Sequence, residues 1–124
     1  MSAIMRILIA DDNQLVRSSI ANLLSDEQGW TVCGGAQNGD ETISLTQQHS
    51  PEVVLLDVSM PGRSGLDIAR LLRKQFPNLK ILMISHHDPL QLLPSALEAG
   101  ANHCLDKACL ATQLIPAIKN LMNA

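Results

Sequence analysis

The sequence predicts an α/β fold, a doubly wound (βα)5 parallel sheet with helices on both faces, on the strength of three observations. Short apolar runs alternate with longer amphipathic stretches, a pattern typical of β-α units. Five such units can be counted in 124 residues, which is the size of a single domain. No Gly/Ser-rich linker, repeat or low-complexity segment divides them. We therefore expect residues 1–124 to form one domain.

The five expected strands are the short apolar runs. The third and fourth are continuously apolar, as strands covered on both faces should be, and are expected at the centre of the sheet. Right-handed crossovers between these strands then make a doubly wound sheet. The runs are Arg6–Ala10, Thr31–Ala36, Val53–Leu56, Lys80–Ile84 and His103–Leu105.

Five helices are expected to follow these strands. The first carries an apolar stripe at helical spacing (Val16, Ile20, Leu23 and Leu24), and Asp12 or Asn13 can cap it. The others are expected at Gly39–His49, Gly65–Phe76, Pro89–Ala99 and about Leu110–Met122. Pro94 is expected near the first turn of its helix, where its missing N–H matters little. Pro116 falls inside the last helix, where it costs about 3 kcal/mol unless a kink absorbs it.

Composition excludes several classes of function. The net charge is -3, and there is one Trp, one Phe and no Tyr, so neither a basic patch nor aromatic stacking favours direct nucleic-acid binding. Cys33, Cys104 and Cys109 form no C-x-x-C pair, which favours a reducing compartment over a disulfide framework. No segment is long and apolar enough for a signal peptide or a membrane span. We expect a cytoplasmic protein that does not contact membranes.

The polar residues that end the expected strands meet at one edge of the sheet. Asp11 and Asp12 follow the first strand, Asp57 the third, Ser85 the fourth and Lys107 the fifth. Alone, each could be a turn, a cap or a surface residue. Together they form a charge-complementary site, in which crowded carboxylates favour a bound cation and all-oxygen ligands favour Mg²⁺. Asp57 could then act as a nucleophile towards phosphorus, with Lys107 and Ser85 binding the phosphoryl oxygens.

The motifs in this order resemble the receiver domain of two-component response regulators, and the resemblance spans essentially the whole chain. The matching motifs are Asp11-Asp12, Val54-Leu55-Leu56-Asp57, Met60-Pro61-Gly62 with Gly65, Ser85 and Lys107. Residues 57–66 and 96–101 are most similar to receivers of the NarL/LuxR type.

The resemblance implies a flavodoxin-like (CheY-like) sheet with strand order 2-1-3-4-5. It implies a phosphorelay signal carrier in which a sensor histidine kinase phosphorylates Asp57, and which catalyses only its own phosphorylation and dephosphorylation. The Mg²⁺ ligands would be Asp12, Asp57, the main-chain carbonyl of Ser59 and, through water, Asp11. Receivers of this type usually precede a helix-turn-helix domain, so DNA would be reached only through an output domain absent from this chain. The resemblance also suggests a homodimer.

Three residues depart from the family pattern. Cys104 stands where the family usually has an aromatic residue that turns inward on activation, which suggests a different output coupling. His86 follows Ser85 where a small residue is common, and its ring could restrict access of a phosphodonor or of water. Ala108 follows Lys107 where many members have Pro.

Two alternative functions stay open from the sequence. The first is a haloacid-dehalogenase-like phosphatase, which also uses a strand-end Asp, Mg²⁺ and a Lys, although Ser59 stands where the second Asp of its D-x-D motif would be. The second is a stand-alone or degenerate receiver that acts as an adaptor, without phosphorylation in the degenerate case, as His86 and Cys104 suggest.

Overall fold

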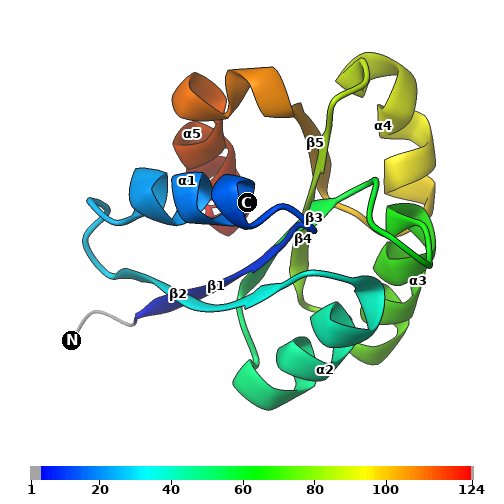
Figure 1. The fold of residues 1–124 in the computed structure, drawn as a ribbon, viewed down its shortest axis with the longest axis horizontal. Coiled ribbons are helices and arrows are strands. Elements are labelled where there is room, and N and C mark those ends of the chain that lie inside the picture. The colour runs from blue at the N-terminus through cyan, green and yellow to red at the C-terminus, as the bar shows by residue number, and fades with distance from the viewer. Residues whose placement is uncertain (1–3, 124) are drawn as a thin grey trace.

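The computed structural model describes residues 4–123, which form one five-stranded parallel sheet flanked by helices (Figure 1). The strand order is β2-β1-β3-β4-β5, so the order implied by the resemblance is confirmed. Along the chain the elements are β1 Met5–Ala10, α1 Gln14–Leu24, β2 Trp30–Ala36, α2 Gly39–His49, β3 Val53–Asp57, α3 Gly65–Gln75, β4 Lys80–Ser85, α4 Pro89–Glu98, β5 His103–Asp106, a 3-10 turn Lys107–Cys109, and α5 Leu110–Met122.

The helices form two layers, with α1 and α5 on one face of the sheet and α2, α3 and α4 on the other (Figure 1). Alternate strand residues supply the two cores. In β3, Val53 and Leu55 pack on the α1–α5 side, while Val54 and Leu56 pack on the opposite side. All five residues of β3 are buried, as expected for a central strand covered on both faces.

Polar caps fix where the helices begin. Asn13, and not Asp12, caps α1, because its side chain accepts the N–H groups of Leu15 and Val16. Ser64 caps α3 in the same way, and Asp88 caps α4. These caps start α1 and α4 just beyond the carboxyl ends of β1 and β4, and start α3 at the end of the loop that follows β3, and so fix the loops that carry the candidate site.

Of the two prolines discussed in the sequence, Pro116 lies where it was expected and Pro94 does not. Pro94 does not lie in the first turn, because Pro89 occupies that turn and α4 begins there; Pro94 is inside the helix. Pro116 lies inside α5, as expected. Both prolines are exposed, so water can hydrate the carbonyl groups that they leave without a helical N–H partner.

The cysteines form no disulfide, and Cys104 belongs to the core. Cys33, Cys104 and Cys109 are all free. Cys104 is 4% exposed, pairs with Met83 of β4, and packs in the cluster that faces α3 and α4. Burial, with a contribution from Asp106, raises the pKa of its thiol to about 11, so Cys104 is a small apolar residue at neutral pH. Within residues 4–123 no helix combines the length and the apolar character needed to cross a bilayer.

Candidate functional site

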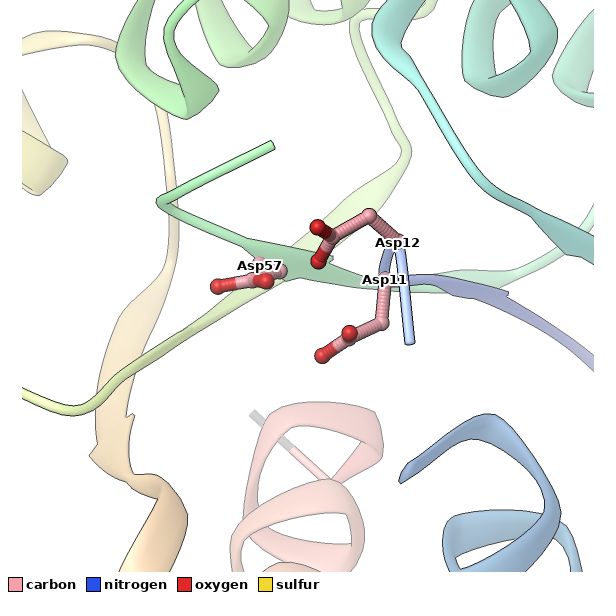
Figure 2. A group of neighbouring side chains, drawn as sticks. All are labelled: Asp11, Asp12 and Asp57. Carbon is pink, nitrogen blue, oxygen red and sulfur yellow. The ribbon is translucent and has the colours of Figure 1, made fainter. Parts of the chain in front are cut away.

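The structure brings the strand-end residues to one edge of the sheet. Asp11 and Asp12 follow β1, while Asp57 is the last residue of β3 and Ser85 the last of β4. Lys107 opens the 3-10 turn directly after β5. Figure 2 shows the carboxylates of Asp11, Asp12 and Asp57 gathered at the ends of their two neighbouring strands.

The three carboxylates are close enough to share one ligand. One oxygen from each of Asp11, Asp12 and Asp57 lies within 4.8 Å of the others. Asp11 and Asp57 are buried at 2% and 3% exposure, whereas Asp12 is exposed. The site is therefore buried at Asp11 and Asp57 and open to solvent at Asp12, where a hydrated ion can enter.

Within residues 4–123, one ammonium group faces these carboxylates. The Nζ atom of Lys107 lies 2.6 Å from Asp11 Oδ2 and 3.1 Å from Asp57 Oδ2, and its side chain is 8% exposed. Burial opposes the charge of Lys107, but its hydrogen bonds to Asp11 and Asp57 and the charges of these carboxylates raise the pKa of the ammonium overall. Lys107 is therefore charged at neutral pH, and three carboxylates against one cation leave the site with excess negative charge.

Asp57 is held at both carboxylate oxygens. Its Oδ2 accepts from Lys107, and its Oδ1 accepts the N–H of Ser59 at 3.1 Å. Burial raises the pKa of Asp57, the Asp11 charge adds to that effect, and the hydrogen bonds from Ser59 and Lys107 oppose it. Gly65 closes the same loop, because its N–H donates to the carbonyl of Val58 at 2.9 Å. This loop therefore fixes the direction in which Asp57 faces.

Ser85 is buried at the neighbouring strand end. Ser85 is 1% exposed, and its Oγ accepts the N–H of His87 at 2.9 Å. Among the described residues, no hydrogen bond joins Ser85 to Asp57 or Lys107. His86 is exposed and lines an apolar groove of about 520 Å³ between α1 and α5, which Lys107 and Ala108 also line.

Sequence reasoning did not identify three groups that support the site. The Arg17 guanidinium donates to the carbonyl of Asp11 at 2.6 Å, and the N–H of Asn13 donates to Asp11 Oδ1 at 2.9 Å. The third is the N–H of His87. An Asp followed two residues later by a free N–H is a common turn motif and could have indicated Asn13. The contact of Arg17 depends on the tertiary structure and leaves no signal in the sequence.

Comparison with known proteins assigns the chain to a family. Residues 7–119 match the family model of the response regulator receiver domain. The chain belongs to this family. It is 34% identical over 114 residues to the response regulator GacA of Pseudomonas protegens, covering 92% of this chain and 54% of that protein. It is 32% identical over 115 residues to UvrY of Escherichia coli, covering 93% and 53%.

Solved structures agree with this assignment. The receiver domain of the response regulator NarL from Mycobacterium tuberculosis is 31% identical and superposes with a TM-score of 0.88, covering 96% of each chain. The resemblance to LuxR/NarL-type receivers is therefore confirmed, as is the CheY-like fold. The receiver spans about half the length of the curated relatives that it matches.

Proposed function

We propose that this receiver accepts a phosphoryl group on Asp57 in a Mg²⁺-dependent reaction, with a sensor histidine kinase as donor. The observation that carries the proposal is the position of Asp57, a buried strand-end carboxylate held by Lys107 and flanked by Asp11 and Asp12. Membership in the receiver family supports the same reaction.

The residues present fit a Mg²⁺ ion. The donor set consists of oxygens, which hard cations prefer, and it offers few protein ligands beside an opening to solvent, as suits an ion that keeps several waters. Asp12, Asp57 and the main-chain carbonyl of Ser59 would hold the ion, with Asp11 acting through water. When bound, Mg²⁺ supplies positive charge that offsets both the carboxylates and the phosphoryl oxygens.

The reaction itself needs little of the protein beyond position and charge. A carboxylate oxygen of Asp57 forms a bond to phosphorus while the bond from phosphorus to the donor imidazole nitrogen breaks, and the electron pair leaves with that nitrogen. Lys107 stays protonated throughout, since its pKa is raised, and its ammonium binds a phosphoryl oxygen. Ser85 donates its hydroxyl hydrogen to another phosphoryl oxygen, while its Oγ can still accept the N–H of His87.

The output follows from the movement of Ser85. Its hydroxyl would turn towards the new phosphoryl group and so shift α4 and β5 between two arrangements. Because Cys104 is a small core residue, this shift would not use an inward-turning aromatic ring at that position. The relatives are named transcriptional regulators and response regulators, and we propose that residues 1–124 act as the input domain for a separate DNA-binding domain, with a homodimer as one form of output.

Incubation with acetyl phosphate, with and without Mg²⁺, followed by intact mass measurement, tests the proposal. We expect one added phosphoryl group on the wild type with Mg²⁺, and none on Asp57→Asn. Asp88→Asn is a matched control, because Asn caps a helix as well as Asp does and should label normally. Equal labelling of Asp57→Asn, or no labelling of the wild type, contradicts the proposal.

The same samples distinguish the alternatives. Multiple turnover of a generic phosphate ester would favour the haloacid-dehalogenase-like phosphatase, and we expect none. A degenerate receiver would bind no Mg²⁺ and take up no phosphoryl group.

A further inference from the structure

Arg17 contacts the backbone of the acidic pair from outside the site. It is half-buried in the first turn of α1, and its Nη1 donates to the carbonyl oxygen of Asp11 at 2.6 Å. Within residues 4–123 it forms no ion pair with a carboxylate, so its charge is directed at a neutral acceptor. A hydrogen bond from a charged donor to a carbonyl is among the stronger ones in proteins.

The stem of Arg17 is held against the sheet. It lies over β2, where a Cβ atom on Gly35 would sit 3.3 Å from Arg17 Cδ and 3.4 Å from Arg17 Nε. Gly35 therefore leaves the space that the stem occupies. The preceding peptide group is held as well, because the N–H of Asp11 donates to the carbonyl of Ala36 at 2.9 Å. Asp11 is thus tied to β2 through its N–H and to α1 through its carbonyl.

These contacts determine the position of Asp12. The carbonyl of Asp11 and the N–H of Asp12 belong to the same planar peptide, so a donor that holds the oxygen fixes the plane and the Cα of Asp12. Asp11 is further fixed at its side chain by Asn13 and Lys107. The Asp12 side chain is exposed and has no hydrogen-bond partner among the described residues. Its carboxylate is therefore placed by its backbone alone.

We infer that Arg17 is a positioning residue for the metal site, which holds the Asp11–Asp12 peptide so that the Asp12 carboxylate is aimed at the ion. This inference rests on the proposed function, since Asp12 is a ligand only if the site takes a divalent cation. Arg17 touches neither the ion nor the phosphoryl group. Its effect is expected in metal affinity rather than in the chemical step.

Calorimetric titration of the full chain with MgCl₂ alone tests the inference. We expect Arg17→Met to weaken Mg²⁺ binding about tenfold, the lower end of the loss seen when an outer partner of a metal ligand is removed. Arg17→Lys should recover most of the affinity, because an ammonium can also donate to the carbonyl of Asp11. Arg70→Met is the matched control: among the described residues the side chain of Arg70 pairs with Asp67 at an exposed position, and this variant should bind Mg²⁺ as the wild type does.

Phosphorylation by acetyl phosphate gives a second readout. With Arg17→Met, the Mg²⁺ concentration for half-maximal rate should rise by the same factor, while the rate at saturating Mg²⁺ stays near that of the wild type. General damage to the fold would instead lower the rate at saturating Mg²⁺. If Arg17→Met does not fold, Arg17→Leu replaces it, because its side chain also lacks a hydrogen-bond donor and the same loss is expected.

The outcomes separate this inference from the proposed function. Wild-type affinity in Arg17→Met, or an equal loss in Arg70→Met, overturns the role of Arg17 and leaves the phosphoacceptor proposal intact. A wild type that binds no Mg²⁺ would instead overturn the metal site itself.

Discussion

Replacing Lys107 by Met should destabilise the receiver strongly, because it removes the cation that faces the buried carboxylates. Met keeps most of the volume of the stem, so the change acts mainly on charge and hydrogen bonding. The lost contacts are those to Asp11 at 2.6 Å and Asp57 at 3.1 Å.

The magnitude follows from these two hydrogen bonds. A hydrogen bond to a charged group contributes about 1.5–3 kcal/mol, and part of that sum is offset because Met has no charge to desolvate. We expect a net loss of about 3 kcal/mol in the free energy of unfolding at pH 7 without Mg²⁺, in keeping with the broken buried pairs of other proteins. That is a large fraction of the roughly 5–15 kcal/mol that stabilises a typical domain.

The loss should depend on pH in a definite direction. The pKa of Lys107 is raised above its ordinary value of 10.5, so its contribution is complete below that pH and disappears as the pH rises through the raised pKa. At low pH the difference between the two proteins should also shrink, because Asp57, whose pKa is raised by burial, takes up a proton and no longer needs a cation.

Urea unfolding followed by circular dichroism measures the difference. Lys119→Met is the control, because Lys119 pairs with Glu27 at 3.3 Å with its own side chain 57% exposed, and such pairs contribute about 1 kcal/mol or less. If Lys107→Met loses no more stability than Lys119→Met, the electrostatic account of the site is wrong.

Three further changes have expected outcomes. Because burial raises the pKa of Asp57, Asp57→Asn should stabilise the fold above that raised pKa, and thermal melts should show the gain fading as the pH falls from the raised pKa to the ordinary value of 3.8. A Cβ on Gly65 would lie 2.6 Å from the Cα of Val58, so Gly65→Ala should lower the free energy of urea unfolding by about 2 kcal/mol, and an unchanged value would refute the close approach. Arg73 donates to Asn102 Oδ1 and to three carbonyls at the ends of α3 and α4, so Arg73→Met should speed amide hydrogen exchange around Asn102, and exchange at the wild-type rate would count against that role.

The fold was largely predictable because the strands and helices differ sharply in hydrophobic pattern. The expected strands mainly stopped short of their polar last residues. Asp57 and Ser85 still pair in the sheet although their side chains are not apolar. The strand order came from the family resemblance, since several orders satisfy the same pattern. The position of Pro94 was predicted wrongly, because either Pro89 or Pro94 could occupy the first turn of α4, and Pro89 does so.

The residues of the candidate site could be predicted from the sequence, but the contacts among them could not. Topology alone brings strand ends to one edge, which is why Asp57 and Lys107 could be named together. That Lys107 lies nearer to Asp11 than to Asp57 depends on the path of the turn after β5. The contact of Arg17 with the Asp11 carbonyl depends on how α1 packs over β2, which no local pattern encodes.

The central claim is that Asp57, and neither Asp11 nor Asp12, forms the acyl phosphate. Borohydride reduces an acyl phosphate to an alcohol, so trapping the protein after reaction with acetyl phosphate and Mg²⁺ marks the modified carboxylate for peptide sequencing by mass spectrometry. We predict a reduced side chain at position 57 alone, and only when Mg²⁺ was present. Reduction at position 11 or 12, or a Mg²⁺-independent product at position 57, would contradict the account.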